Sequence, residues 1–291
     1  MIGLGLVFGS LIAVSLWELC CPRRRRGFPA LGRRLSNLGF WIVNLVLAAY
    51  LLPKVALSGI RLQVPLRPEF LPERAAAALS LLAGFLILDL LQYVVHRCEH
   101  RIPFLWRFHA LHHTDPDVDV TTSVRHHPFE YLPAAAIYSG AGFLLAIPAN
   151  VITIHALAVF VTAAVQHGNI RLPHWCERGL SSVLVTTDLH RVHHSAKRAE
   201  ADANYGAVLS VWDRVFGTLV LLSPREHQRI VFGVADMPRH DGLNPIPMLL
   251  LPLQLGRRPT RRVPAWPPRM NSRRNSQRRN GGKATVRPKR V

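Results

Sequence analysis

The chain has 291 residues, of which 49% are hydrophobic and only 18% are charged. So little charge argues against a fold that is exposed to water on every side. The four cysteines show neither a CxxC spacing nor the pattern of a disulfide framework. The formal net charge is +19, and where it lies along the chain decides what it means.

The positive charge is concentrated in two runs. Residues 23–34 hold six arginines, residues 257–291 hold thirteen Lys or Arg, and neither run contains an acid. Without these runs, 17 basic residues face 17 acidic residues in the rest of the chain. Both runs lie beside or beyond apolar segments, so we expect them to face the cytoplasm and to meet anionic lipids. Nucleic acid is not the expected partner, although an arginine-rich tail can bind phosphates without specificity.

Four long apolar stretches predict membrane helices, at residues 2–17, 38–52, 75–95 and 132–165. The first has no basic residue before it and four arginines after it, which favours a span with its N-terminus outside over a cleaved signal peptide. Residues 38–52 then run outward, and residues 75–95 return to the cytoplasm. The stretch 132–165 is interrupted near Pro148, which predicts a hairpin of two short helices that enters the membrane and returns.

These segments predict an all-α integral membrane protein with about three transmembrane helices and a helical membrane hairpin. We divide the chain into an N-terminal transmembrane hairpin with an Arg-rich cytoplasmic loop (1–73), a catalytic domain (74–222), an interfacial segment (223–255) and a basic, disordered tail (256–291). Arginine far outnumbers lysine, which indicates a GC-rich genome and hence a bacterial inner membrane. A protein of the endoplasmic reticulum would have the same topology.

The chain contains fifteen histidines, and most of them are clustered. On a helix, residues three or four apart share a face, so an HxxxH or HxxHH box can present several imidazoles to one point. Imidazole suits iron, zinc, copper and nickel, so the boxes alone do not name the metal. One HxxxH and two HxxHH boxes supply eight candidate ligands for a two-metal site: His96, His100, His109, His112, His113, His190, His193 and His194.

In their order and spacing, six segments between Asp89 and Leu219 resemble the membrane fatty acid hydroxylase and sterol desaturase superfamily. They are DLLQYVVHRCEH, WRFHALHH, DVTTSVRHHPFE, QHGNIRLP, TTDLHRVHHS and NYGAVLSVWDRVFGTL. The resemblance implies an all-α membrane fold with a cytosolic, histidine-rich helical metal cap. It also implies a non-haem centre of two iron ions that activates O2, with zinc as a conceivable substitute. It assigns the eight box histidines as ligands and adds His127 and His167. Because His126 directly precedes His127, a shift of register would make His126 the ligand instead.

Ligating histidines usually donate their second N–H to a carboxylate, carbonyl or amide. Asp89 and Tyr93 share a helical stripe with His96 and His100, so both are candidates to hold these imidazoles in place. Asp188 is a third candidate. Glu130, Asn204 and Asp213 could serve the same purpose, but each of these three, like Asp188, could equally be a helix cap or a surface residue. We interpret His155 as a core residue, and His174, His227 and His240 as structural or exposed.

The expected function is O2-dependent hydroxylation or desaturation of a C–H bond in a lipid, fatty acid or sterol-like substrate that enters from the bilayer. The chain has no dinucleotide-binding GxGxxG, no iron–sulfur cysteine spacing and no haem module, so an external reductase, ferredoxin or cytochrome is the expected electron donor. A zinc-dependent membrane hydrolase or isomerase is one alternative, although the carboxylate base of an HExxH motif is absent. A metal-binding scaffold or transporter is another, although a transporter would place its ligands at mid-membrane depth.

Overall fold

Helices are the regular elements of this protein. The computed structural model describes residues 2–25, 30–56, 72–234 and 245–255, all of which fall within one unit that ends at Pro259. Within these residues the only β-structure is two isolated bridges, Leu184 with Leu209 and Ser195 with Phe232. The predicted all-α class is therefore correct. The predicted basic tail (256–291) and most of the predicted outer segment between the second and third spans lie outside the described residues.

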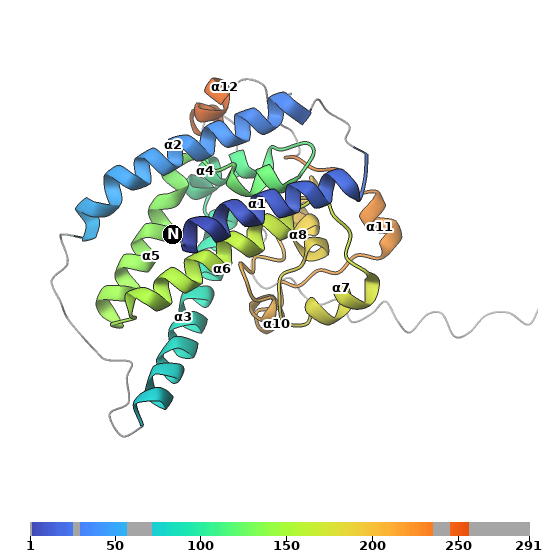
Figure 1. The fold of residues 1–291 in the computed structure, drawn as a ribbon. Helices are drawn as coiled ribbons and strands as arrows, with labels where there is room; N and C mark the ends of the chain where they lie inside the picture. Colours follow the sequence, from blue (N-terminus) through green and yellow to red (C-terminus); the bar gives the residue numbers. More distant parts are fainter. Residues whose placement is uncertain (1, 26–29, 57–71, 235–244, 256–291) are drawn as a thin grey trace, which may run out of the picture. The chain divides into compact units, whose positions relative to one another are not determined.

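Five long helices form the framework in Figure 1: α1 (Ile2–Cys20), α2 (Ala30–Ala56), α3 (Glu73–Arg101), α5 (Tyr131–Leu144) and α6 (Ala149–His167). Among the described residues, three segments are long and apolar enough to cross a membrane: Gly3–Cys20, Glu73–Arg101 and Ala149–His167. Two of them correspond to the spans expected at 2–17 and 75–95. The span expected at 38–52 lies within α2, where some side chains are outside the described set.

The segment expected to form a hairpin contains two helices, α5 and α6, with a break at residues 145–148. Ala146 has a positive φ of 49°, and Pro148 is extended and precedes the first turn of α6. Proline cannot continue a helix but is accepted where one begins, so the break falls where the sequence suggested. The lengths differ from the expectation of two short helices, because α6 has 19 residues and is long enough to span on its own.

Small residues let these helices approach one another. A Cβ at Gly84 of α3 would lie 3.0 Å from Val151 Cγ1 and 3.2 Å from Ile147 Cγ2, so glycine permits close contact with the start of α6. Leu88 and Ala141 join Ile147 and Val151 in a buried cluster that packs α3 against α5 and α6. The other faces of the long helices carry exposed large hydrophobic residues, which is typical of surfaces that meet lipid.

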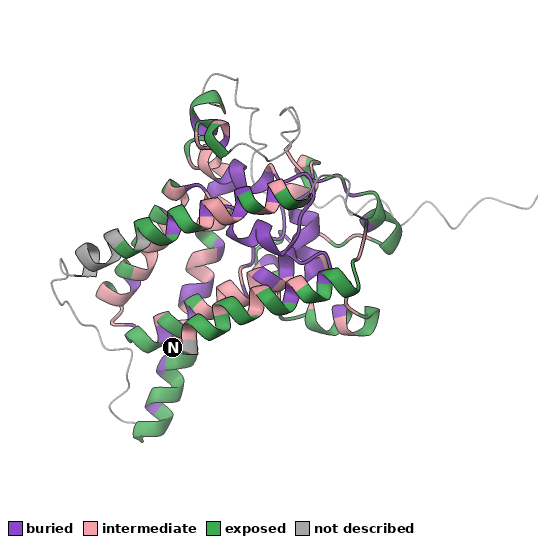
Figure 2. Ribbon diagram, turned by 45° about the horizontal axis from the view of Figure 1, so that its top comes forward, coloured by how far each residue is buried: buried purple, intermediate pink, exposed green. Residues whose placement is uncertain are grey.

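Short helices surround the inner ends of the long ones: α4 (Pro103–His113), η1 (Val120–Val124), η2 (Pro128–Glu130), α7 (His174–Leu180), α8 (Thr187–His193), α9 (Arg198–Ala201), α10 (Val211–Val215), α11 (Pro224–Gln228), α12 (Pro245–Leu249) and α13 (Leu251–Leu255). Their starts have local causes: Pro103 lies at the first position of α4, and the side chain of Thr186 caps α8. Figure 2 shows that the buried residues gather among these short helices.

The arginine-rich loop differs from the lipid-facing loop that its charge suggested. Arg33 is fully buried and pairs with Asp119 and, at 2.9 Å, with Asp115. Arg34 pairs with Glu18 at 2.7 Å and with Asp119. Burial alone would raise the pKa of Asp119, but Arg33 and Arg34 outweigh it and lower this pKa to about 2.

Two more arginines of this run also have internal partners, since Arg23 pairs with Asp188 and Arg24 with Asp117. Four of the six arginines are thus engaged by acids of the chain itself. This pairing leaves little of the loop's charge for the anionic lipids that we expected there.

Candidate metal centre

Nine of the ten histidines expected as ligands lie in two adjacent groups. The first group contains His96, His100, His109, His113 and His193, and the second contains His112, His167, His190 and His194. In each group, one ring nitrogen from every member lies within 4.8 Å of the others. The side chains come from α3, α4, α6 and α8, whose inner ends meet at this point. The tenth, His127, lies in neither group.

Each HxxHH box divides between the two groups. In α4, His109 and His113 are four residues apart and face the first group, while His112 faces the second. In α8 the assignment is reversed: His190 and the C-cap residue His194 face the second group, and His193 faces the first. Successive helical residues are turned by about 100°, so adjacent histidines must point in different directions. One box can therefore serve two neighbouring metal ions.

The spacing of the ring nitrogens fits metal binding. In the second group, His167 Nε2 lies 2.9 Å from His190 Nε2 and 3.1 Å from the Nε2 atoms of His112 and His194. In the first group, His109 Nε2 and His113 Nε2 are 3.0 Å apart. Two nitrogens that bind one ion at about 2.1 Å and at right angles lie about 3 Å apart. The same separation among neutral imidazoles that all present a lone pair would otherwise be repulsive.

The opposite ring nitrogens fix the orientation of the imidazoles. Three Nδ1 atoms donate to backbone carbonyls: His96 to Tyr205 at 2.8 Å, His193 to Ala203 at 2.8 Å and His167 to Ala163 at 2.7 Å. A carbonyl can only accept, so Nδ1 carries the proton and Nε2 presents its lone pair to the group. Hydrogen bonds of this kind usually set the tautomer of metal ligands.

Several ring nitrogens of the two groups are buried and have no hydrogen-bond partner in the described part of the chain. They are both nitrogens of His100, Nε2 of His193 and Nδ1 of His190 and His194. A buried polar atom without a partner is costly, and a metal ion would satisfy those that point into a group. Nε2 of His193 and one nitrogen of His100 can point into the first group, which fits a metal site there. His190 and His194 turn Nε2 towards the second group, so their unpartnered Nδ1 atoms face away from it.

Burial also sets the protonation state of the boxes. Desolvation, followed by the neighbouring imidazoles, holds the pKa of His112, His113, His190, His193 and His194 well below the usual value of 6.5. These side chains are therefore neutral at physiological pH. Neutral imidazole is the form that binds a metal, so no proton has to be displaced first.

Glu130 lies beside the first group. One of its oxygens, Oε1, accepts from His109 Nδ1 at 2.8 Å and from His126 Nδ1 at 2.7 Å. Burial would raise the pKa of Glu130, but His126 and His109 outweigh it and lower that pKa well below its usual value. Glu130, Glu99 and His109 also form a third cluster with metal-binding potential. The sequence suggested Glu130 as an orienting residue, but it gave no indication of Glu99.

The adjacent histidines His126 and His127 have different surroundings. His126 stacks on His112 with ring centroids 4.4 Å apart, and its pKa is raised, because Glu130 outweighs the lowering effect of burial. His127, our expected ligand, turns away: its Nδ1 accepts the backbone N–H of Phe129, and its Nε2 lies 3.2 Å from the Leu249 carbonyl oxygen. Pro128 starts η2, and the His127 ring caps the first turn of that helix, which directs it away from the centre.

Asp89 and Tyr93 are both buried on α3, but neither contacts a box histidine through a hydrogen bond. Asp89 accepts from Trp212 Nε1 at 2.8 Å and from the backbone N–H groups of Val208 and Leu209. His155 is buried, as expected of a core residue, with Nε2 3.4 Å from Asp89 Oδ1. Asp89 therefore binds the 208–212 segment rather than a ligand.

The remaining candidates differ in what they hold. Asp213 accepts from the backbone N–H groups of Tyr205 and Gly206, both at 2.8 Å, and from Thr218 Oγ1, which also contacts the Tyr93 hydroxyl. It thereby fixes the backbone whose Tyr205 carbonyl orients His96. Asn204 bonds to the carbonyls of Leu189 and Val220.

Asp188 lies farther from the histidines. It pairs with Arg23 and lies 3.7 Å from His227, without contact to a box histidine. Of the expected orienting residues, Asp213 and Glu130 therefore act most directly on the candidate ligands, while Asp188 secures the loop that follows α1.

Comparisons with known proteins show that this part of the chain is similar to lipid hydroxylases and monooxygenases. Residues 81–218 match the family model described as fatty acid hydroxylase. The ornithine lipid hydroxylase OlsE of Rhizobium tropici is 33% identical over 151 residues, which cover 52% of this chain and 44% of that protein. Human alkylglycerol monooxygenase is 28% identical over 159 residues, covering 52% of this chain and 32% of that enzyme. The fatty acid hydroxylase vlmA of Lecanicillium sp. is 30% identical over 146 residues, covering 46% and 40%.

The matched segment thus spans less than half the length of each of these relatives. It contains all nine grouped histidines, together with Glu130 and Asp213. No solved structure matches this chain.

Proposed function

Because this chain belongs to the membrane fatty acid hydroxylase superfamily, we propose that it is a membrane-bound, non-haem di-iron oxygenase that hydroxylates a C–H bond of a lipid. The observation that carries the proposal is the pair of buried histidine groups, with five and four imidazoles, whose facing nitrogens are spaced for metal binding. One iron would be held by each group. When bound, iron supplies the redox chemistry that activates O2 towards an unreactive C–H bond.

The side chains of this site bind, orient and exclude water. The Nε2 atoms of the boxes provide the lone pairs, and the Nδ1 hydrogen bonds to Tyr205, Ala203 and Ala163 keep these rings in one orientation. All nine rings are buried or nearly so, which keeps bulk water from the reacting atoms. Preorganised ligands of this kind need little rearrangement when the metal changes its charge.

The first histidine group favours iron over a tetrahedral zinc site, whereas the four imidazoles of the second group suit either metal. Zinc sites in proteins almost always have four ligands, or three and a water. The first group offers five imidazoles, and neither group includes a carboxylate in the described part of the chain.

The substrate that we propose is the hydrocarbon part of a polar lipid. The relatives named above carry hydroxylase or monooxygenase in their names, together with an ornithine lipid, an alkylglycerol or a fatty acid. The exposed hydrophobic residues of the long helices would meet the acyl chains of the same bilayer. A substrate could then approach the centre laterally, without leaving the membrane.

We further propose that the metal centre lies at the cytoplasmic face of the membrane. The basic residues that follow α1 favour this orientation, because loops rich in Lys and Arg are retained in the cytoplasm. The electrons for each turnover would come from a separate reductase, ferredoxin or cytochrome, since the chain has no motif for binding a redox cofactor of its own.

The test begins with anaerobic purification in detergent and measurement of metal content. About two irons per chain are expected, with a large loss in a His193→Ala/His194→Ala variant and none in His174→Ala, an exposed histidine outside the groups. The wild type would then be given an electron donor, a mixture of bacterial lipids and 18O2, and a lipid product heavier by one 18O atom is expected. Iron that binds without any labelled product would contradict the oxygenase function, and no metal after reconstitution would contradict the metal centre itself.

A further inference from the structure

Apart from the faces of the long helices, one surface of the protein combines exposed apolar side chains with arginines. It is formed by α7, by the 180–184 segment that follows it and by α10, which lie side by side in Figure 1. Its large apolar residues are well exposed: Trp175 (79%), Leu180 (41%), Val183 (52%), Val215 (64%) and Phe216 (36%). We call these five residues the α7–α10 patch. A soluble protein rarely leaves such a set uncovered without a partner.

The two halves of the patch are fixed to one another. Val185 N–H donates to the Val208 carbonyl at 2.9 Å, and Ser210 N–H donates to the Val183 carbonyl at 2.9 Å. Arg214 Nη2 donates to the Ser181 carbonyl at 2.6 Å. These bonds make α7, the following segment and α10 a single surface rather than three independent loops.

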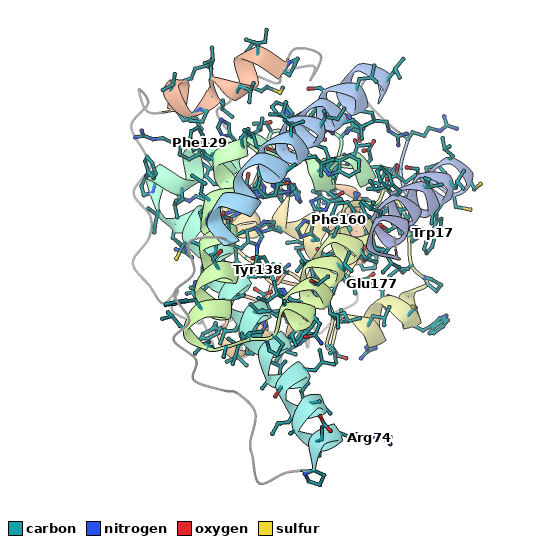
Figure 3. The ribbon with its side chains drawn as sticks, turned by 60° about the vertical axis from the view of Figure 1, so that its left-hand side comes forward. Trp17, Arg74, Phe129, Tyr138, Phe160 and Glu177 are labelled. Atoms are coloured by element: carbon teal, nitrogen blue, oxygen red, sulfur yellow. The ribbon has the colours of Figure 1, made fainter. Side chains whose placement is uncertain are left out.

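The charge around the patch has one sign. Arg171, Arg178 and Arg214 are exposed, whereas Glu177 and Asp213, the acids of the same two segments, are buried. Figure 3 labels Glu177 on α7. The backbone carbonyl of Arg178 accepts from Ser181 Oγ at 3.2 Å. No hydrogen bond or ion pair joins the guanidinium group of Arg171 or Arg178 to the described residues, so their charge is available to a partner. A surface of aromatic, aliphatic and arginine side chains without exposed acid complements an anionic membrane surface.

Contacts with α3 and α6 set the depth of this surface relative to the membrane. Asp89 and Tyr93 of α3 hold α10, through the hydrogen bond from Trp212 and through the stacking of Phe216 on Tyr93 with ring centroids 5.2 Å apart. At about 1.5 Å per residue, Asp89 lies about 24 Å along α3 from Glu73, close to the roughly 30 Å thickness of a hydrocarbon core. In Figure 3, Arg74 marks the distant end of this helix.

Helix α6 places the surface at the same depth. Gln166, in the last turn of α6, donates to the Ala207 carbonyl at 2.7 Å, one residue before the segment that Asp89 binds. The surface is therefore attached at the last turn of α6 and, on α3, about 24 Å from Glu73, near the depth at which a hydrocarbon core would end.

From these observations we infer that the α7–α10 patch is an interfacial anchor, which lies in the headgroup region of an anionic leaflet beside α3 and α6. Trp175, Val183 and Val215 insert at the boundary with the acyl chains, and Arg171 and Arg178 pair with lipid phosphates. This inference rests on the membrane placement proposed above but not on the oxidation chemistry. Because Asp213 belongs to α10 and also holds the Tyr205 backbone, the anchor connects the membrane surface to the orientation of His96.

The test measures membrane depth with spin labels. In full-length protein whose four native cysteines are replaced, Val183→Cys and Val215→Cys are labelled and reconstituted into vesicles of phosphatidylcholine and phosphatidylglycerol. Leu82→Cys, exposed on α3 about 14 Å from Glu73, reports the bilayer interior. Val231→Cys, similarly exposed but among the short helices, reports water. Labels at 183 and 215 should be reached by O2 and protected from a soluble nickel complex, as at 82 and in contrast to 231.

The outcomes separate this inference from the function proposed above. If position 82 is protected but 183 and 215 are as open to nickel as 231, the anchor is refuted and the membrane placement stands. If position 82 is itself open to nickel, the membrane placement fails, and the anchor with it. Phosphatidylglycerol is anionic, so the labels at 183 and 215 should be better protected from nickel in mixed vesicles than in vesicles of pure phosphatidylcholine. In the Arg171→Gln/Arg178→Gln variant, this difference between the two kinds of vesicle should be lost. Retention of that difference would contradict the pairing of these arginines with lipid phosphates.

Discussion

Asp213 offers the sharpest test of how the protein orients a candidate ligand that it does not touch. Its carboxylate accepts three hydrogen bonds, from Tyr205 N–H, Gly206 N–H and Thr218 Oγ1, and the Tyr205 carbonyl accepts from His96. In Asp213→Asn the shape is kept, but one oxygen becomes an NH2 group. Whichever oxygen is replaced, a donor then faces a backbone N–H donor.

The expected cost follows from these contacts. A hydrogen bond to a charged group contributes about 1.5–3 kcal/mol, and at about 1.4 kcal/mol per tenfold this is roughly 10- to 150-fold in an equilibrium constant. If the Tyr205 backbone shifts, His96 loses its orientation and metal affinity falls within this range. Replacing groups that orient metal ligands typically weakens binding by about 10–100-fold.

The assay is competition with a chelator on the anaerobic protein, combined with urea unfolding of the metal-free form. Asp188→Asn is the matched control, because Asp188 also lies among the short helices and pairs with Arg23 but contacts no box histidine. The control should lose stability and keep its metal affinity. The reasoning is refuted if Asp213→Asn lowers the stability of the metal-free protein while its metal affinity equals that of the wild type.

A Cβ at Gly206 would lie 2.5 Å from the Leu209 carbonyl oxygen, so Gly206→Ala should lower the free energy of unfolding in urea by about 1–3 kcal/mol. Gly179→Ala, where a Cβ would have nothing within 4 Å, should lower it much less. Glu130→Gln removes the charge that accepts from His109 and His126, and chelator competition should show metal affinity about 10–100-fold lower; equal affinity would exclude an orienting role. The folded-state pKa values of the buried box histidines in α4 and α8 lie below the unfolded value of about 6.5, so the unfolded chain takes up more protons as pH falls. The metal-free protein should therefore lose stability between about pH 7.5 and 5.5, and a constant urea midpoint over this range would contradict the burial of neutral imidazoles.

The histidine groups were largely readable from the sequence because their geometry is local. Ligands four residues apart on one helix meet whatever the rest of the fold does, as His96 does with His100, His109 with His113 and His190 with His194. The division of each HxxHH between two groups also follows from the helical turn. The assignment of His127 over His126 needed the direction of a turn around Pro128, which spacing does not contain.

The interactions that the sequence did not predict connect distant parts of the chain. Arg33 and Asp119 are 86 residues apart, and nothing near either residue indicates the other. A run of arginines with no acid among them is typical of a lipid-facing loop, and only the tertiary fold brings Asp115, Asp117 and Asp119 to it. Asp89 and Tyr93 were correctly placed on one buried stripe, but their partners come from segments more than a hundred residues later.

The same acids decide whether the segment that matches the family can fold independently of the helices before it. Asp115 and Asp119 lie inside the region that matches the family, while Arg33, Arg34 and Asn37, which bind them, lie outside it on α2. Deleting α2 would leave two buried carboxylates without their cations beside the helix that carries His109, His112 and His113, and the loss of one partner of a buried pair costs about 3–5 kcal/mol. The histidine-bearing segment therefore cannot be transplanted alone into another membrane scaffold. A chimaera must exchange α2 together with it, or replace both sides of the ion pairs at once.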